Sequence, residues 1–175
     1  MKTKAIMAKP TLKDPFFNKS IILIIDDLKQ KKMGLILNKE MEESASDIWD
    51  SVNPKLKIKN KTLKNGGDVY GSICVIHKLK EYADKNLFKD CYITISTKKI
   101  EKIIAATYEY EMYVGYCAWS PKDFELEFQN GLWWEIEPDE HMIFDNKDYW
   151  KLKKEEQNKK YLDVLNIKMQ MYNLN

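Results

Sequence analysis

The chain has 175 residues and a mass of 20.8 kDa, with 44% hydrophobic and 32% charged residues. This length corresponds to one domain, and the composition excludes intrinsically disordered, collagen-like and low-complexity chains. All 29 basic residues are lysines. The protein therefore has no arginine finger and no arginine-based reading of bases, and a phosphate site would have to use lysines or backbone amides.

The first half of the chain alternates aliphatic runs with polar stretches. Residues 20–25 and 33–37 are aliphatic and are separated by a polar stretch, which predicts two buried strands joined by a hairpin. Ser44 or Ser46 can cap a short helix that runs through Val52. The string NGGD at 65–68 predicts a turn before a strand at 73–77.

The second half predicts strands and helices in turn. Residues 91–96 alternate as in a half-buried strand, residues 98–110 place apolar side chains on one face of a helix, and 111–119 form a strand. Ser120 and Pro121 predict a helix start, and Gly131 its end. A strand at 132–136, a short helix at 138–144 and a helix from Tyr149 onward follow.

This order lacks the regular strand–helix alternation of a doubly wound fold. It predicts an α+β fold: a single compact domain with a mixed, largely antiparallel, bent and barrel-like sheet flanked by helices. We assign residues 1–152 to this domain. Residues 153–175 are expected to form a helical extension that packs on the domain or on a partner.

Charge and cysteine usage bear on partners and compartment. Residues 1–100 carry 20 lysines and 12 acidic residues, whereas residues 101–175 carry 9 and 15, so we predict a dipolar molecule. The three cysteines include no C-x-x-C pair, and the chain has neither a signal-peptide core nor an aliphatic run long enough for a membrane span. We expect a cytoplasmic protein that does not enter a membrane.

Several short strings occur in an order that resembles the AlgH/YqgE family of small bacterial proteins. They are MAKP at 7–10, DPFFNKS at 14–20, MGLILN at 33–38, GGDV at 66–69, IH at 76–77, GYCAW at 115–119, FELE at 124–127 and Trp133. The resemblance covers about residues 5–152 and implies an α+β fold and a cytosolic protein. It implies no firm activity, although one member gives the family a transcriptional-regulator label.

The residues that carry the resemblance also suggest a ligand pocket. Its candidate residues are Gly66, Gly67, His77, Tyr116, Trp119 and Glu125. The glycines could direct backbone amides at a phosphate or carboxylate, or could form only a tight turn. His77 could act as a general base or be a hydrogen-bonded structural residue.

A row of lysines suggests a second kind of site. Lys55, Lys57, Lys59, Lys61 and Lys64 carry no acidic residue between them, and an extended chain would space the alternate ones about 6.6 Å apart, which suits phosphate contacts. Lysines on edge strands also prevent aggregation of sheets.

Three hypotheses follow. The leading one is a non-enzymatic regulatory or binding domain whose partner is another protein or a small anionic ligand. The second is a small hydrolase or transferase in which Glu125 or Asp68 orients His77. The third is nucleic-acid binding through the lysine row. The acidic run at 135–141 could hold Mg²⁺ or Ca²⁺, but we favour the solvated side of a strand as its explanation, and we expect neither a metal nor a cofactor.

Overall fold

The computed structural model describes residues 4–27, 30–52, 58 and 61–172. The strands are β1 (Ala5–Ala8), β2 (Ile21–Asp27), β3 (Lys32–Ile36), β4 (Glu40–Ser44), β5 (Thr62–Asn65), β6 (Val69–His77), β7 (Lys85–Phe88), β8 (Cys91–Thr94), β9 (Tyr110–Trp119) and β10 (Trp133–Ile136). The helices are α1 (Ala45–Val52), α2 (Thr97–Ala106), α3 (Pro121–Gln129), α4 (His141–Phe144) and α5 (Tyr149–Tyr172), with a 3-10 turn, η1 (Lys80–Tyr82).

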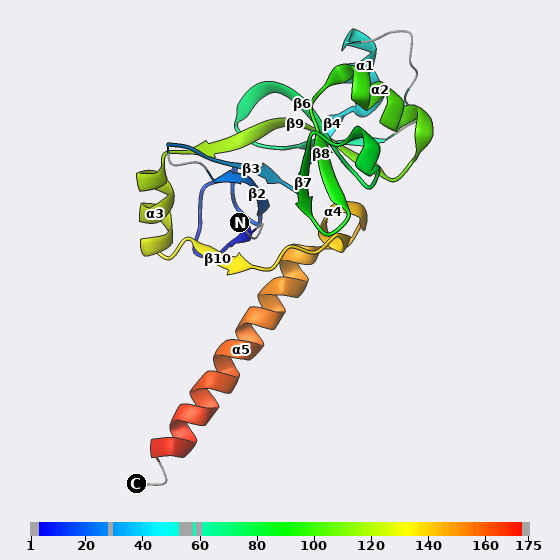
Figure 1. Ribbon diagram of the computed structural model, residues 1–175. Coiled ribbons are helices and arrows are strands. Elements are labelled where there is room, and N and C mark those ends of the chain that lie inside the picture. The colour runs from blue at the N-terminus through cyan, green and yellow to red at the C-terminus, as the bar shows by residue number, and fades with distance from the viewer. Residues whose placement is uncertain (1–3, 28–29, 53–57, 59–60, 173–175) are drawn as a thin grey trace.

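The strands form one curled sheet, shown in Figure 1. Its order is β10-β1-β2-β3-β9-β6-β8-β7, while β4 pairs with β5 and β5 with β9. The β5–β9 pair is parallel, and the other pairs among the described residues are antiparallel. The sequence-based expectation of a mixed, largely antiparallel, bent sheet in an α+β domain is confirmed, and the sheet is a half-barrel.

Strand β9 belongs to both halves of this sheet. Its last residues, from Cys117 to Trp119, pair with β3, whereas residues 110–114 and Tyr116 pair with β6. Gly115 lies at the irregularity of the β6–β9 ladder with φ of +78°, a conformation that glycine adopts without the cost of a Cβ. The sheet therefore changes direction at Gly115, and separate apolar cores form on its faces.

Three clusters of buried side chains fill these cores. The largest lies against α4 and includes Leu23, Leu35 and Tyr113; a second lies with α1 and α2 around Trp49; and a third lies with α3 around Trp119. Both faces of the central strands are thus covered. This explains why β8 is buried at all four positions instead of half-buried as its alternation predicted.

Most of the predicted elements are present. The 20–25 and 33–37 runs are the β2–β3 hairpin, the Ser44 hydroxyl accepts from the Asp47 amide at the start of α1, and the Ser120 hydroxyl accepts from the Asp123 amide at the start of α3. The helix expected to extend to residue 110 is shorter and ends at Ala106, since Tyr110 belongs to β9. Strands β1, β4, β5 and β7 were not predicted.

Helix α5 leaves the half-barrel and projects away from it (Figure 1). Its first turn is anchored, because Trp150 is buried and its indole Nε1 donates to the Ala8 carbonyl at 2.7 Å. Beyond it, Tyr161, Leu162 and Met169 are more than half exposed. These three side chains are therefore open to solvent, and the packing of residues 153–175 on the domain or on a partner stays a prediction. Among the described residues, no helix has the length and hydropathy that crossing a membrane would require.

Candidate functional site

His77 is a structural residue with both ring nitrogens engaged. The side chain is fully buried at the end of β6, Nδ1 accepts from the Leu79 amide at 3.1 Å, and Nε2 lies 3.0 Å from the Thr94 hydroxyl. The Thr94 hydroxyl donates to the Tyr82 carbonyl, so Nε2 carries the proton and donates to Thr94. Burial lowers the pKa of His77 and further favours this neutral form.

This arrangement does not suit a general base. Neither Asp68 nor Glu125 is among the hydrogen-bond partners of His77 within the described chain, and both carboxylates are exposed. Neither of the two acids that the hydrolase or transferase hypothesis names therefore orients His77, and the nearby Glu81 and Asp84 act on its pKa only through their charge.

Gly66 and Gly67 let two backbone segments cross closely. A Cβ on Gly67 would lie 2.0 Å from the Tyr116 carbonyl carbon, and one on Gly66 would lie 2.3 Å from the Gly115 oxygen. The Gly66 amide donates to the Val114 carbonyl, and the Gly67 amide donates to the Asn65 side chain. Because both amides are used within the protein, these glycines form a tight crossing and do not cradle an anion.

The other three residues of the expected pocket are also apart from His77. Trp119 is buried between the rings of Phe17 and Phe124. Tyr116 is half-buried beneath the Lys31 ammonium, and Glu125 is exposed on α3.

The distance along β9 confirms the separation. His77 faces Tyr110 across the β6–β9 ladder, and Tyr116 lies six residues further along the strand, about 20 Å at the usual rise. The six residues expected from sequence do not form one pocket, because the two halves of the sheet hold them in different places.

The described lysines of the row face the protein instead of solvent. The Lys61 ammonium donates to the Tyr110 carbonyl and pairs with Glu111 at 3.2 Å. Lys64 is buried and also pairs with Glu111, at 3.3 Å. These two do not belong to a free row of cations. Lys55, Lys57 and Lys59 lie outside the described residues.

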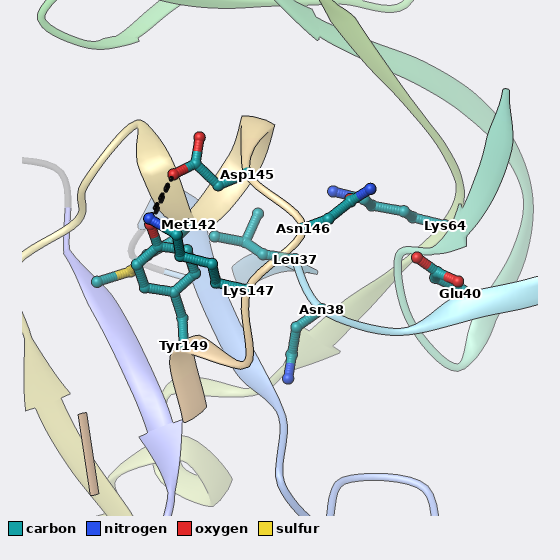
Figure 2. Close-up of a pocket in the computed structure, with 9 residues that line it drawn as sticks. All are labelled: Leu37, Asn38, Glu40, Lys64, Met142, Asp145, Asn146, Lys147 and Tyr149. Carbon is teal, nitrogen blue, oxygen red and sulfur yellow. Dashed lines mark hydrogen bonds and ion pairs between the residues drawn. The ribbon is translucent and has the colours of Figure 1, made fainter. Parts of the chain in front are cut away.

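A pocket of about 180 Å³ opens between the β3–β4 connection, β5 and the segment between α4 and α5 (Figure 2). It is lined by Leu37, Asn38, Glu40, Lys64, Met142, Asp145, Asn146, Lys147 and Tyr149. Pockets for drug-sized ligands are about 300–1,000 Å³. This one therefore suits a small metabolite.

Lys64 is the central polar residue of this pocket. Strand β5 is covered on both sides, so the side chain is only 10% exposed, and the ammonium donates to the Ile143 carbonyl at 2.8 Å and pairs with Glu111. Burial lowers the pKa of Lys64, while Glu111 and, more weakly, Glu40 oppose the shift. An ammonium has three N–H donors. The described residues accept two of them through oxygen atoms, and the ammonium also lies 5.7 Å from the centre of the Tyr113 ring, so one N–H has no oxygen acceptor among the described residues.

The opposite end of the pocket is already neutralised. The Tyr149 hydroxyl donates to Asp145 at 2.9 Å, and the Lys147 ammonium lies 3.6 Å from the same carboxylate, as the dashed line in Figure 2 marks. His141 Nδ1 lies 3.3 Å from it. The hydrogen bond from Tyr149, with smaller contributions from His141 and Lys147, holds the pKa of Asp145 below its usual value.

Asn38, from the MGLILN string, shapes the wall next to Leu37. Its side-chain oxygen accepts from the Ile21 amide and its nitrogen donates to the Lys19 carbonyl, both at 2.8 Å. Lys19 has a left-handed backbone with φ of +58°. Asn38 thus holds the turn that carries DPFFNKS, and its role is structural.

No other chemical centre is evident in the part of the chain that is described. The three cysteines are free and buried, and burial raises the pKa of the Cys117 thiol well above its usual value, which does not suit a nucleophile. The described residues contain no group of three or more His, Cys, Asp or Glu side chains placed to hold a metal ion.

The fold and pocket define a small α+β half-barrel with a polar cavity at its edge. A family model described as AlgH-like matches residues 5–162, and the chain belongs to this AlgH-like family. The resemblance found in the sequence is thereby confirmed. All residues that line the pocket lie within the matched region.

Relatives and solved structures agree with this assignment. UPF0301 proteins from Aliivibrio fischeri and Bacteroides thetaiotaomicron are 28% and 26% identical, covering 86% and 90% of this chain and 88% and 83% of their own length. The solution structure of the AlgH protein from Pseudomonas aeruginosa matches with a TM-score of 0.72 at 19% identity, covering 86% of this chain and 84% of that one. A crystal structure of a Corynebacterium diphtheriae protein matches with a TM-score of 0.69 at 18% identity, covering 85% and 83%. At these identities the two structures show the fold alone.

Sequence reasoning missed this pocket because its walls come from three distant segments. Lys64 was counted with the lysine row, and Met142 and Tyr149 were read only as helical residues. The sequence of β5 offered no signal for the pocket, because the adjacent Leu63 and Lys64 are both buried and the strand does not alternate between a buried and an exposed face. A buried lysine needs a partner, and sequence does not name Glu111 as that partner.

Proposed function

We propose that the protein is a non-enzymatic binding domain that holds a small polar ligand in the pocket at Lys64 and acts through that complex. The observation that carries this proposal is a buried lysine with one unused N–H donor at the wall of a cavity. A group of this kind can form a charge-assisted hydrogen bond to a ligand oxygen, which is stronger than a bond between neutral groups.

Two features favour binding over catalysis. The engaged nitrogens of His77 argue against the hydrolase or transferase alternative, and Lys64 is held by Glu111 and the Ile143 carbonyl in a fixed orientation. A regulatory role would follow if ligand binding changed the affinity for another macromolecule. We place this activity in the cytoplasm, where buried free cysteines are stable.

The test uses the methyl group of Met142 as a reporter inside the pocket. Protein labelled with ¹³C at its methionine methyls is titrated separately with L-valine, isovalerate and isobutylamine, and spectra are recorded at each step. We expect at least one probe to shift the Met142 signal saturably and to leave Met112, which lies in a different core, unchanged.

A variant that blocks the pocket provides the control. Asn146→Trp places a large side chain at the exposed rim and should abolish the shift, whereas Asn130→Trp, at the exposed end of α3, should preserve it. If none of the three probes moves the Met142 signal in the unmodified protein, the proposed function is wrong.

A further inference from the structure

The charged groups are fully paired at one end of the pocket and only partly paired at the other. Asp145 has three partners, whereas Glu40 has no hydrogen-bond or ion-pair partner among the described residues, and Lys64 has one unused N–H. Glu40 and Lys64 face each other in the β4–β5 ladder, and Figure 2 shows them with Asn146 at the same end. A buried ammonium with one N–H left over and an exposed carboxylate with no described partner therefore stand side by side.

The proximity of Lys64 and Glu40 distinguishes ligands by their charge. A simple carboxylate that accepts from Lys64 would also be close to the negative Glu40, and a simple amine close to Glu40 would face the positive Lys64. Opposite charges attract and like charges repel with energies that grow as water is excluded. A ligand that carries an anionic and a cationic group close together would place its anion against Lys64 and its cation against Glu40.

The rest of the cavity determines the kind of side chain. Leu37 and Met142 are almost fully buried and give the pocket an apolar wall between its two ends. The small volume leaves space for a short side chain only. Apolar surface placed against these two residues would add to the affinity without a further polar partner.

Building on the proposed function, we infer that the ligand is a zwitterion of the α-amino-acid class with a short apolar side chain. Its carboxylate accepts from Lys64 and Asn146, its ammonium lies beside Glu40, and its side chain contacts Leu37 and Met142. Glu40 thereby acts as the residue that distinguishes an amino acid from the matching carboxylic acid.

The test compares L-valine with isovalerate, which lacks the ammonium, and with isobutylamine, which lacks the carboxylate, by isothermal titration calorimetry of the full chain. Each missing charge removes one charge-assisted contact, so L-valine should bind about tenfold or more tighter than either analogue. The variant Glu40→Gln should remove the advantage of L-valine over isovalerate. Glu43→Gln, the same change in the same strand outside the pocket, should preserve it.

The outcomes separate this inference from the proposed function. If isovalerate binds as tightly as L-valine and Glu40→Gln changes neither, the pocket binds ligands but the amino-acid assignment is wrong. If isobutylamine binds as tightly as L-valine, the role of Lys64 as the carboxylate anchor is wrong. If all three fail to bind, both proposals are wrong.

Discussion

The half-barrel and the distal part of α5 contain similar apolar residues, which are buried in the half-barrel and exposed in α5. In the half-barrel, leucines and isoleucines of β2 and β3 are buried on both faces of the sheet, whereas in α5 Leu162, Val164 and Ile167 are at least half exposed. Burial of an apolar side chain stabilises a fold by about 1.5–3 kcal/mol, whereas an exposed apolar side chain contributes no such stabilisation. Helix α5 itself contains a buried aromatic residue, Trp150, and an exposed one, Tyr161.

The difference indicates separate roles for the two regions. The family match ends at residue 162, so most of the exposed apolar segment lies beyond the part of the chain shared with the family. The half-barrel carries the pocket proposed to bind a ligand, and the distal helix is the region where a partner contact is expected. Substitutions in each region can test this division.

The largest effect is expected at the anchor of α5. Trp150→Ala removes a buried indole and its hydrogen bond to the Ala8 carbonyl, and should lower the free energy of unfolding by about 3–5 kcal/mol. The matched change Tyr161→Ala, on the exposed part of the same helix, should change it by less than about 0.5 kcal/mol. Urea unfolding followed by circular dichroism measures both. Equal effects of the two changes would contradict the division.

The next largest effect is expected where the chain crosses itself in the half-barrel. Gly67→Ala would place a Cβ 2.0 Å from backbone, so the segment must move, and we expect a loss of about 3 kcal/mol or more. Gly71→Ala meets no atom within 4 Å and has only the strain of its φ of +105°, about 1 kcal/mol. Unfolding curves in urea would rank the two variants, and the reverse ranking would show that the crossing is not close-packed.

A smaller, pH-dependent effect is expected from His77. Because its folded pKa is lowered from 6.5, the unfolded chain takes up a proton first as the pH falls. The stabilising contribution of neutral His77 is thus complete above pH 6.5 and is lost as the pH falls below this value towards the folded pKa. His77→Gln should remove this component from the difference in unfolding free energy between pH 7.5 and pH 5.5, whereas His141→Gln should retain it. An unchanged pH dependence in His77→Gln would show that the pKa of His77 is the same in the folded and the unfolded protein.

The smallest effect on stability is expected from the double change Leu162→Gln and Leu165→Gln. Both side chains are partly or largely exposed, so the free energy of unfolding should change by less than about 0.5 kcal/mol. If the distal helix packs on another copy, the same change should shift the sedimentation coefficient toward that of the monomer at high protein concentration. A large loss of stability would instead place these leucines against the half-barrel.

The elements with strong local signals were predicted well, and the pocket was not. The β2–β3 hairpin, the capped start of α3 and the break at Gly131 depend on side chains a few residues apart, which a sequence pattern contains. Strands β1 and β4 are short and lack a clear alternation, so only their partners, β10 and β5, define them. His77 and the two glycines were recognised as special positions, but their partners decided that they are structural.

The sequence by itself determined that this is one α+β domain of the AlgH-like family, since composition, capping residues and the order of short strings are local properties of the chain. The tertiary structure decided which lysine is buried, which glycines are crowded by backbone and which carboxylate stands beside Lys64. These properties depend on contacts between segments distant in the chain, such as Lys64 with Ile143, and burial alone changes the chemistry of a charged group. The pocket, and with it the ligand specificity that we propose, is therefore a consequence of how the half-barrel closes on α4 and the start of α5.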